Sequence, residues 1–517
     1  MLASLRHIVR LIRLARILAR HGTLDLLGLV GLGALAKALR PILPKPAPAI
    51  ATLRRGQRIA AALQEMGPAF IKFGQTWSTR ADLVGEEVAE DLAMLRDRLP
   101  PFPVEETRRA IEQAFSRPVA DLFQSIDAVP VAAASIAQVH FAVTSDGREV
   151  AIKVLRPAIE QAFRRDIALF AWLARLAERT QPGMRRLRPV DVVKRFSDGT
   201  EREMDLTLEA AAASELADNF RDDPLYLVPA VDWSRTATRV LTLERVHGLN
   251  IADRPGLIAA GIDLEALVTN LLRVFLLQVF RDGFFHGDMH PGNLLVRDDG
   301  ALVAVDFGIM GRLDLPSRRY LAELMLAFLR RDYVRAAEIH FEAGYVPADQ
   351  SLAAFAQACR AMGEPVLGRP ANEISIARFL AQLLRTTERF KMETQPQLLL
   401  LQKTMVVVEG VARSIEPSVV FWEKAEPVIA EWIRDNLGPV RQAADGARRA
   451  LAALRRLPGL VDEAEGLLAE SRRNGLRLHP ETVQALSSQR RPYRSIEVVL
   501  AMIAGAALLA LGYCAGG

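Results

Sequence analysis

Residues 284–295, which read FFHGDMHPGNLL, decide the fold. Two histidines, one aspartate and one asparagine lie within eight residues, and apolar residues flank them on both sides. Three interpretations are open at this point. The stretch is a metal site built on the imidazoles of His286 and His290, a catalytic loop built on Asp288 and Asn293, or a polar turn that the histidines brace. The surrounding sequence decides between them.

Two β-hairpins are predicted on either side of this loop in the chain. Residues 129–143 and 149–155 are rich in β-branched residues and are separated by a turn containing Asp146-Gly147. Residues 293–308 form a second candidate hairpin, and residues 239–246 form a further strand. Residues 51–125, 158–220 and most of the chain from 248 to about 490 have the apolar spacing of helices.

Strands followed by a polar loop, a hairpin and many helices are the order of parts in a protein kinase. Lys153 lies on a predicted strand, where its ammonium can reach the α and β phosphates of ATP. Asp288 is followed five residues later by Asn293 and eighteen residues later by Asp306 of Asp-Phe-Gly. In kinases these three positions carry the base or orienting carboxylate and two Mg²⁺ ligands. One carboxylate and one amide are sufficient, because Mg²⁺ keeps several waters and binds phosphate oxygens.

A hydrolase metal site with histidine ligands is the rival interpretation. Such a site normally needs three or more converging ligands, and the remaining histidines are scattered along the chain. Only Cys359 and Cys514 are present, so a disulfide framework and a thiolate zinc site are both excluded. We therefore predict that His286 and His290 brace a catalytic loop in a protein of a reducing, cytoplasmic-type compartment.

From about residue 60 to residue 320, the sequence closely resembles the UbiB family of atypical kinases, the aarF-domain kinase-like proteins associated with ubiquinone biosynthesis. Lys72-Phe73-Gly74-Gln75 matches the KxGQ motif of the family, and Glu203-Met204-Asp205 matches its ExD motif. HGDMHPGN and DFG complete the set. The alanine-rich loop of the family is matched by Ala132, Ala133, Ala134, Ser135, Ile136, Ala137, Gln138, Val139 and His140.

The resemblance implies an ATP and Mg²⁺ site and gives each motif a place in it. Glu209 falls where the family places the partner of the strand lysine, Lys153, and the two would position the phosphates. The KxGQ residues and the alanine-rich loop would face the nucleotide. The implied site residues are Lys72, Gln75, Ala132 to Val139, Lys153, Glu203, Asp205, Glu209, Asp288, Asn293 and Asp306.

Three departures from an ordinary kinase bear on how nucleotide would be held and which substrates would be bound. Alanines replace the glycines of the phosphate loop, so this loop has less access to positive φ and should hold nucleotide in a more restricted way. His286-Gly287-Asp288 lacks the arginine of His-Arg-Asp, and no Ala-Pro-Glu segment follows Gly308. These two absences disfavour a protein kinase that acts on other proteins.

The composition of the chain is that of a folded protein and argues against a nucleic-acid partner. The chain has 517 residues, of which 50% are hydrophobic and 25% are charged, as in a folded protein of two or three domains. Its net charge of only +5 gives little support for nucleic-acid binding, and no nucleic-acid partner is predicted.

The two ends of the chain predict membrane association. A basic amphipathic helix near the N-terminus is suited to an anionic bilayer surface, or to packing on the body of the protein. No cleavage site of the A-x-A type follows it, so a signal peptide is not expected. From Val498 to Gly517 there is no charged residue, and Arg490, Arg491 and Arg494 stand just before. This predicts a transmembrane helix with the preceding chain in the cytoplasm, the alternative being a buried terminal helix.

We therefore predict an α+β, bilobal protein-kinase-like fold with a helical N-terminal extension and a C-terminal transmembrane helix. The predicted parts are a basic segment with a Pro-rich linker (1–50), the extension with KxGQ (51–125), the N-lobe (126–247), the C-lobe (248–440), a helical region (441–495) and the membrane anchor (496–517). Ala501 and Gly505 have a spacing compatible with a homodimer.

The predicted function is that of an ATP- and Mg²⁺-dependent atypical kinase or ATPase at the bacterial inner membrane, with its catalytic domain in the cytoplasm. The link to ubiquinone biosynthesis, and to its lipid intermediates and enzymes as partners, is implied by the resemblance alone. A nucleotide-binding pseudokinase that organises the biosynthetic enzymes is the alternative.

Overall fold

The computed structural model describes most of the chain up to residue 437. The described residues are 2–28, 31–78, 84–93, 95, 100–181, 185, 188–365, 385–387, 389–392, 396–419 and 421–437. The chain up to residue 435 forms one compact unit. None of the described helices combines the length and the apolar character needed to span a bilayer. The predicted region 441–495 and the predicted anchor 496–517 lie outside the described residues.

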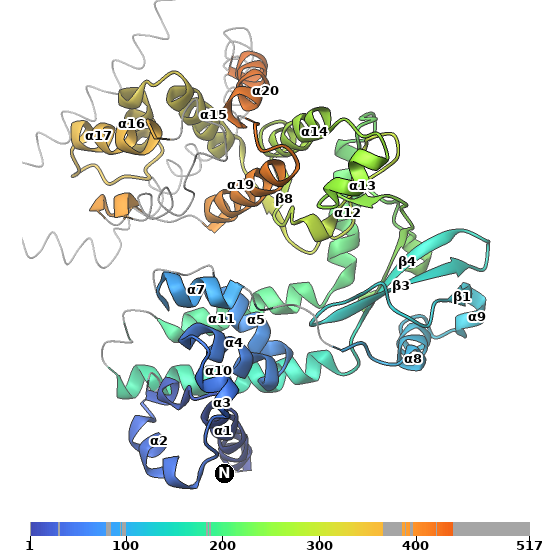
Figure 1. The fold of residues 1–517 in the computed structure, drawn as a ribbon, viewed down its shortest axis with the longest axis vertical. Helices are drawn as coiled ribbons and strands as arrows, with labels where there is room; N and C mark the ends of the chain where they lie inside the picture. Colours follow the sequence, from blue (N-terminus) through green and yellow to red (C-terminus); the bar gives the residue numbers. More distant parts are fainter. Residues whose placement is uncertain are drawn as a thin grey trace, which may run out of the picture. The chain divides into compact units, whose positions relative to one another are not determined.

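The N-terminal part of the chain is a set of helices (Figure 1). Their bounds are α1 Leu2–Arg20, α2 Gly33–Leu39, α3 Pro48–Ala51, α4 Arg55–Met66, α5 Pro68–Ser78 and α7 Glu86–Ala93. Leu11, Ala15, Ile17 and Leu18 of α1 are buried in one cluster with Ala62 of α4. Residues 10–20 thus pack on the body of the protein, and binding of this helix to a membrane surface stays a prediction.

A five-stranded antiparallel sheet forms the N-lobe, as expected for a kinase-like fold (Figure 1). The strand order is β1-β3-β4-β6, and β2 pairs with β3. The predicted hairpin around Asp146-Gly147 is confirmed, because β3 pairs antiparallel with β4 across this turn. The bounds are β1 Phe123–Ile126, β2 Ala132–Ala133, β3 Ala137–Thr144, β4 Glu149–Leu155 and β6 Val240–Glu244.

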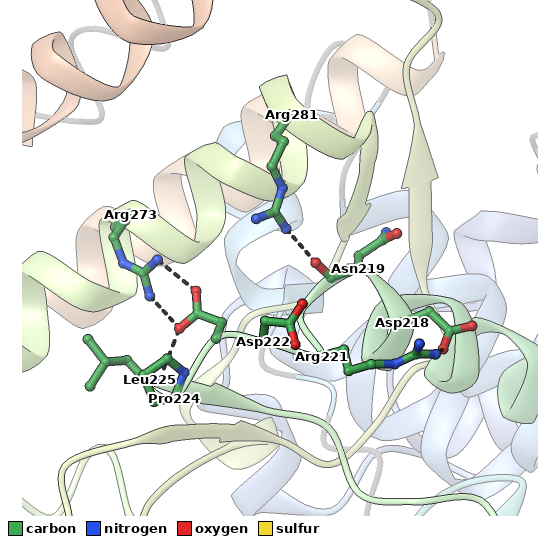
Figure 2. Close-up of a pocket in the computed structure, with 9 residues that line it drawn as sticks. Asp218, Asn219, Arg221, Asp222, Pro224, Leu225, Arg273 and Arg281 are labelled. Carbon is green, nitrogen blue, oxygen red and sulfur yellow. Dashed lines mark hydrogen bonds and ion pairs between the residues drawn. The ribbon is translucent and has the colours of Figure 1, made fainter.

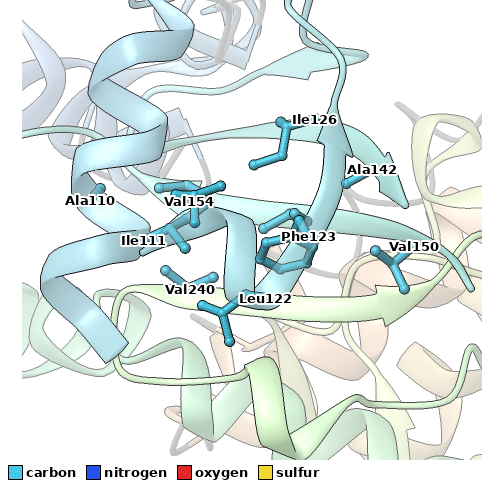
Figure 3. Packing of buried hydrophobic residues seen from close by; sticks show 11 residues of the cluster. Ala110, Ile111, Leu122, Phe123, Ile126, Ala142, Val150, Val154 and Val240 are labelled. Atoms are coloured by element: carbon cyan, nitrogen blue, oxygen red, sulfur yellow. The ribbon is translucent and has the colours of Figure 1, made fainter. Parts of the chain in front are cut away.

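One face of this sheet is covered by α8 Val104–Phe115 and α9 Val119–Leu122 (Figure 3). Ile111 of α8 is fully buried against Ile152 and Val154 of β4. These β4 residues alternate with Lys153, and successive side chains on a strand point to opposite faces. The apolar core on the α8 side therefore directs Lys153 to the other face of the sheet.

Three helices lie between β4 and β6 in the chain: α10 Ile159–Thr180, α11 Pro189–Glu203 and α12 Leu206–Asn219. An aromatic cluster joins the first two to α5. The ring of Phe73 lies 4.9 Å from that of Phe170 on α10 and 5.4 Å from that of Phe196 on α11. This cluster fixes the helix that carries KxGQ beside the helix that ends at Glu203.

The remaining strands and helices form the mostly helical C-lobe (Figure 1). The second predicted hairpin is confirmed, because β9 pairs antiparallel with β10. The strands are β5 Tyr226–Leu227, β7 Leu249–Asn250, β8 Phe284–His286, β9 Leu294–Val296, β10 Leu302–Ala304 and β11 Met310–Arg312. The helices are α13 Arg254–Ala259, α14 Leu264–Leu276, α15 Leu315–Leu329, α16 Tyr333–Glu342, α17 Leu352–Gly363, α19 Pro396–Ile415 and α20 Phe421–Leu437.

Candidate active site

Three charged side chains from distant parts of the chain meet between the sheet and the C-lobe. Nζ of Lys153 lies 2.7 and 2.9 Å from the two carboxylate oxygens of Glu209. It also lies 2.9 Å from Oδ2 of Asp306. The Lys153 and Glu209 side chains are 17% and 6% exposed, whereas that of Asp306 is 42% exposed. The structure thus brings together the predicted strand lysine, its predicted partner and the aspartate of Asp-Phe-Gly.

Each member of this cluster is positioned by its own element. Lys153 comes from β4, and Glu209 comes from the first turn of α12. Asp205 begins α12 as its N-cap, because its carboxylate accepts a hydrogen bond from the backbone N–H of Thr207 at 3.0 Å. Asp306 follows β10, and its Oδ1 accepts the N–H of Gly308 at 3.0 Å.

Burial and mutual attraction set the charges of the cluster. Burial alone would lower the pKa of Lys153, but the carboxylates of Asp306 and Glu209 raise it above its usual value. Burial opposes ionisation of Asp306, yet the Lys153 ammonium lowers the pKa of this carboxyl to about 2. Burial raises the pKa of Glu209, and Lys153 only partly offsets this. The Lys153 ammonium therefore stabilises two carboxylates that lie close together.

The loop between β8 and β9 carries the second half of the site. The N–H of Asp288 donates to Nδ1 of His286 at 3.1 Å, and Nε2 of the same ring donates to the carbonyl of Asp306 at 2.6 Å. Nδ2 of Asn293 donates to the carbonyl and to Oδ2 of Asp288, at 3.0 and 3.2 Å. These hydrogen bonds hold the loop. Oδ1 of Asp288 takes part in none of them and faces α19.

Gln278 is a site residue that the sequence interpretation missed. It lies in a π-helical turn, Leu277–Asp282, which follows α14, and its Oε1 accepts the backbone N–H of His286 at 2.8 Å. Single π-helical turns are frequent at functional sites. No periodicity in the sequence indicated this turn.

The residues present fit a Mg²⁺ ion. Asn293 uses its amide nitrogen on Asp288, and within the described structure no hydrogen bond engages its amide oxygen. The partly exposed carboxylate of Asp306 supplies a second oxygen donor. An amide and a carboxylate oxygen are donors that Mg²⁺ prefers.

The histidine contacts favour bracing over metal binding. Both ring nitrogens of His286 are engaged by backbone groups, and Nδ1 of His290 accepts the N–H of Gly292 at 3.2 Å. Over the described part of the chain, no three His, Cys, Asp or Glu side chains converge as metal ligands. The bracing role predicted for the two histidines agrees with these contacts.

The alanine-rich loop is anchored by Arg156, which the sequence interpretation also missed. Nε and Nη2 of Arg156 donate to the carbonyl of Ala134 at 3.0 and 2.9 Å. Its Nη1 donates to the carbonyl of Pro100 at 3.0 Å. No residue between 132 and 139, all of which are described, has a positive φ. The loop therefore avoids the backbone angles that glycine would allow, as predicted from its alanines.

Within this loop, Val139 and Gln138 face opposite sides of the sheet. Val139 pairs with Lys153 across the sheet, so the two side chains share a face. The Gln138 side chain lies on the other face, where it hydrogen bonds with Phe102 and with the hydroxyl of Thr107 at 3.0 Å. A contact of Gln138 with nucleotide would therefore have to come from its backbone.

The KxGQ and ExD motifs meet each other. Nζ of Lys72 on α5 lies 2.7 Å from Oε2 of Glu203 at the end of α11. Nε2 of Gln75 donates to the carbonyl of Leu95 at 3.4 Å. The predicted orientation of Lys72 and Gln75 toward the nucleotide stays a prediction.

After Asp-Phe-Gly the chain enters helix almost at once. Residues Met310–Arg312 form β11, which pairs with β8, and Asp314 then caps α15. The segment between Gly308 and Leu315, all of which is described, is short, and its strand β11 pairs with β8, so it contains no long activation segment. Instead, α19 packs against β11 and α14 beside the loop of Asp288.

A polar depression at the far end of α12 is separate from this site (Figure 2). Its Arg273 binds the carboxylate of Asp223 with two bonds of 2.7 and 2.9 Å, and Arg281 donates to the carbonyl of Asn219 at 2.8 Å. Asp218 stands nine residues beyond Glu209 on the same helix, about 14 Å away at 1.5 Å per residue. These contacts join the end of α12 and the segment after it to α14 and to the π-helical turn Leu277–Asp282.

Comparisons with known proteins agree with this geometry. The ABC1 atypical kinase-like domain matches residues 94–340, and the UbiB helical domain matches residues 359–420. The chain is 42% identical over 470 residues to the probable protein kinase UbiB of Marinobacter nauticus. This match covers 88% of this chain and 85% of that protein. It is 43% identical over 473 residues to the probable protein kinase UbiB of Xanthomonas oryzae pv. oryzae, with 89% and 83% covered.

A solved structure shares the architecture. The complex of Rv3197 with erythromycin from Mycobacterium tuberculosis superimposes with a TM-score of 0.51 and 25% sequence identity. The match covers 70% of this chain and 92% of that protein.

Proposed function

This chain belongs to the UbiB family of ABC1 atypical kinase-like proteins, and on that premise we propose that it is an ATP-dependent kinase or ATPase that supports ubiquinone biosynthesis. The observation that carries the proposal is the meeting of Lys153, Glu209 and Asp306 beside the loop of Asp288 and Asn293. The strand lysine, its glutamate partner and the acidic residues expected of a phosphoryl-transfer site are present.

Each residue has a role that its contacts support. Glu209 holds Lys153 so that the ammonium faces the α and β phosphates of ATP. Asp288, fixed by Asn293 and by the His286 ring, orients the hydroxyl of the acceptor or a water molecule. Asp306 and Asn293 would hold Mg²⁺, which when bound neutralises charge on the phosphate oxygens.

The acceptor is water or a small molecule in this proposal. Chain order after Asp-Phe-Gly supports this, because α15 begins where a protein kinase has its peptide-binding segment. The family supports a role in ubiquinone biosynthesis. The uncharged run 498–517 supports a tail anchor in the bacterial inner membrane, where a lipid-soluble substrate would be held.

The test compares the purified wild type with Asp306→Asn. We expect the variant to lose Mg²⁺-dependent nucleotide binding and phosphate release, with and without membranes, because it loses the one carboxylate of the proposed metal site. Asp298→Asn is the matched control, since it makes the same change at an exposed turn of the same hairpin.

Equal phosphate release by the wild type and Asp306→Asn would refute the catalytic proposal. Nucleotide binding that depends on Asp306 without any phosphate release would favour the alternative, a pseudokinase that uses nucleotide as a switch.

A further inference from the structure

Helix α19 places one ammonium group opposite the loop of Asp288. Nζ of Lys403 lies 4.0 Å from Oδ1 of Asp288, and the two side chains are 45% and 35% exposed. Lys403 is the single charged residue in the apolar stretch 396–408. A lysine in that stretch, directed at the acceptor-orienting carboxylate, calls for a functional explanation.

The neighbours of Lys403 fix the helix against the loop. The hydroxyl of Thr404 donates to the carbonyl of Gly287 at 3.0 Å and is buried. A Cβ at Gly287 would lie 2.9 Å from Cγ2 of Ile309 and 3.1 Å from Leu400 of α19, so a larger residue would crowd this contact. The contacts of Leu400 and Thr404 with Gly287 therefore set the position of Lys403 relative to Asp288.

The distance between Lys403 and Asp288 leaves the ammonium available to bind another anionic group. At 4.0 Å the pair is beyond hydrogen-bonding distance, which for N–H···O ends at about 3.2 Å. Oδ2 of Asp288 is engaged by Asn293, so Oδ1 is the oxygen that would receive a hydroxyl or water. Lys403 stands beside that same oxygen.

The catalytic loop itself lacks a cation. Residues 286–293 contain no Lys or Arg, and His290 uses Nδ1 on the backbone of Gly292. Lys153, held by Glu209, is assigned to the α and β phosphates and not to the transferring group. Phosphoryl transfer spreads negative charge over the oxygens of the transferring group, and enzymes place Lys or Arg there.

We propose that Lys403 binds the transferring γ-phosphoryl group of ATP, supplying from the helical domain the cation that the loop lacks. This rests on the proposed function. In the step, the bond between the γ-phosphorus and the β–γ bridging oxygen breaks and leaves ADP. A bond from the acceptor oxygen to phosphorus forms, and the acceptor proton passes to Asp288. The Lys403 ammonium keeps its protons and offsets charge on the γ oxygens.

The test compares the wild type with Lys403→Met and Lys403→Arg. Lys424→Met is the matched control, because Lys424 lies on the next helix and pairs with the exposed Glu265 at 3.0 Å. Affinities are measured by calorimetry for ADP with Mg²⁺, and for the same mixture with aluminium fluoride, which mimics the transferring phosphoryl group. Kinetic constants for phosphate release from ATP are measured on the same proteins.

We expect ADP affinity to be unchanged in all four proteins. Aluminium fluoride should tighten ADP binding by the wild type and the control, and this gain should fall by about 10- to 100-fold in Lys403→Met. This loss is smaller than the ~10²–10³-fold loss of rate that follows removal of a fully enclosed donor, because Lys403 is 45% exposed. The kcat for phosphate release should fall by a similar factor with KM nearly constant, and Lys403→Arg should recover part of both.

Two results would overturn the inference. A full gain from aluminium fluoride in Lys403→Met would show that the ammonium does not contact the transferring group. Equal losses of ADP affinity and thermal stability in Lys403→Met and Lys403→Arg would show that Lys403 only tethers α19. A wild type that binds no nucleotide would refute the proposed function and this inference together, which separates that failure from the first two.

Discussion

Replacing Lys153 by methionine removes the ammonium that two carboxylates share. Methionine keeps a similar length and an apolar stem but leaves Glu209, 6% exposed, without a counter-charge. At 2.7 Å and an effective dielectric constant of about 20, the lost attraction is about 6 kcal/mol. Desolvation of the ammonium offsets part of this, and breaking a buried pair costs about 3–5 kcal/mol. We expect a loss near the lower value, about 3 kcal/mol, because Asp306 remains partly in water.

The loss should depend on pH in a defined direction. In the wild type, the low pKa of Asp306 contributes stability that is present above its usual pKa of 3.8 and is lost as the pH falls toward about 2. Without Lys153, the pKa of Glu209, already raised by burial, rises further. Protonation then relieves the unpaired charge in the variant as the pH falls from 7. The stability gap between the two proteins should therefore be widest near pH 7 and narrow toward pH 4.

Urea unfolding followed by circular dichroism at several pH values measures this gap. Amide exchange at Phe307 and Gly308 gives a local reading, because these N–H groups donate to Glu209 and Asp306. Lys194→Met, at an exposed position of α11, is the control and should change stability by no more than about 0.5 kcal/mol. A variant as stable as the wild type at pH 7, or a gap that widens as the pH falls, would refute the reasoning.

Two further predictions concern the residues around the site. Arg156→Ala removes both bonds to the carbonyl of Ala134 and should cost about 1–3 kcal/mol locally. Faster amide exchange in residues 132–137 checks it, and unchanged exchange there would contradict the anchoring role. Lys72→Glu should set two carboxylates against each other and destabilise the contact of α5 with α11, whereas the double variant Lys72→Glu, Glu203→Lys should restore stability. Thermal unfolding of the single and double variants measures it, and a double variant no more stable than the single one would exclude a direct pair.

The sequence predicted the parts of the site that local patterns encode. Both hairpins follow from β-branched runs separated by Asp-Gly turns, and the structure has them at those positions. The face of Lys153 follows from its alternation with Ile152 and Val154. Glu209 is different, because helical spacing alone cannot say which strand a residue of α12 will meet. Its pairing with Lys153 was available only through the resemblance.

The missed residues have partners that no local pattern shows. Arg156 binds a carbonyl 22 residues earlier, and Thr404 binds one 117 residues earlier. Backbone carbonyls have no identity in a sequence, so a side chain that binds one leaves no complementary residue to find. Lys403 did leave a signal, since it is the one charge in an apolar helical run.

His286, which first suggested a metal site, joins the two halves of the site as an uncharged ring. Its Nδ1 accepts from the N–H of Asp288 and its Nε2 donates to the carbonyl of Asp306, so only the neutral tautomer with its proton on Nε2 makes both bonds. Burial lowers the pKa of His286, which keeps that neutral form. A protonated ring would lose the bond to Asp288, and a metal on either nitrogen would displace a backbone group. The spacing between the acceptor-orienting carboxylate and the Asp-Phe-Gly aspartate therefore depends on this imidazole staying neutral and free of metal.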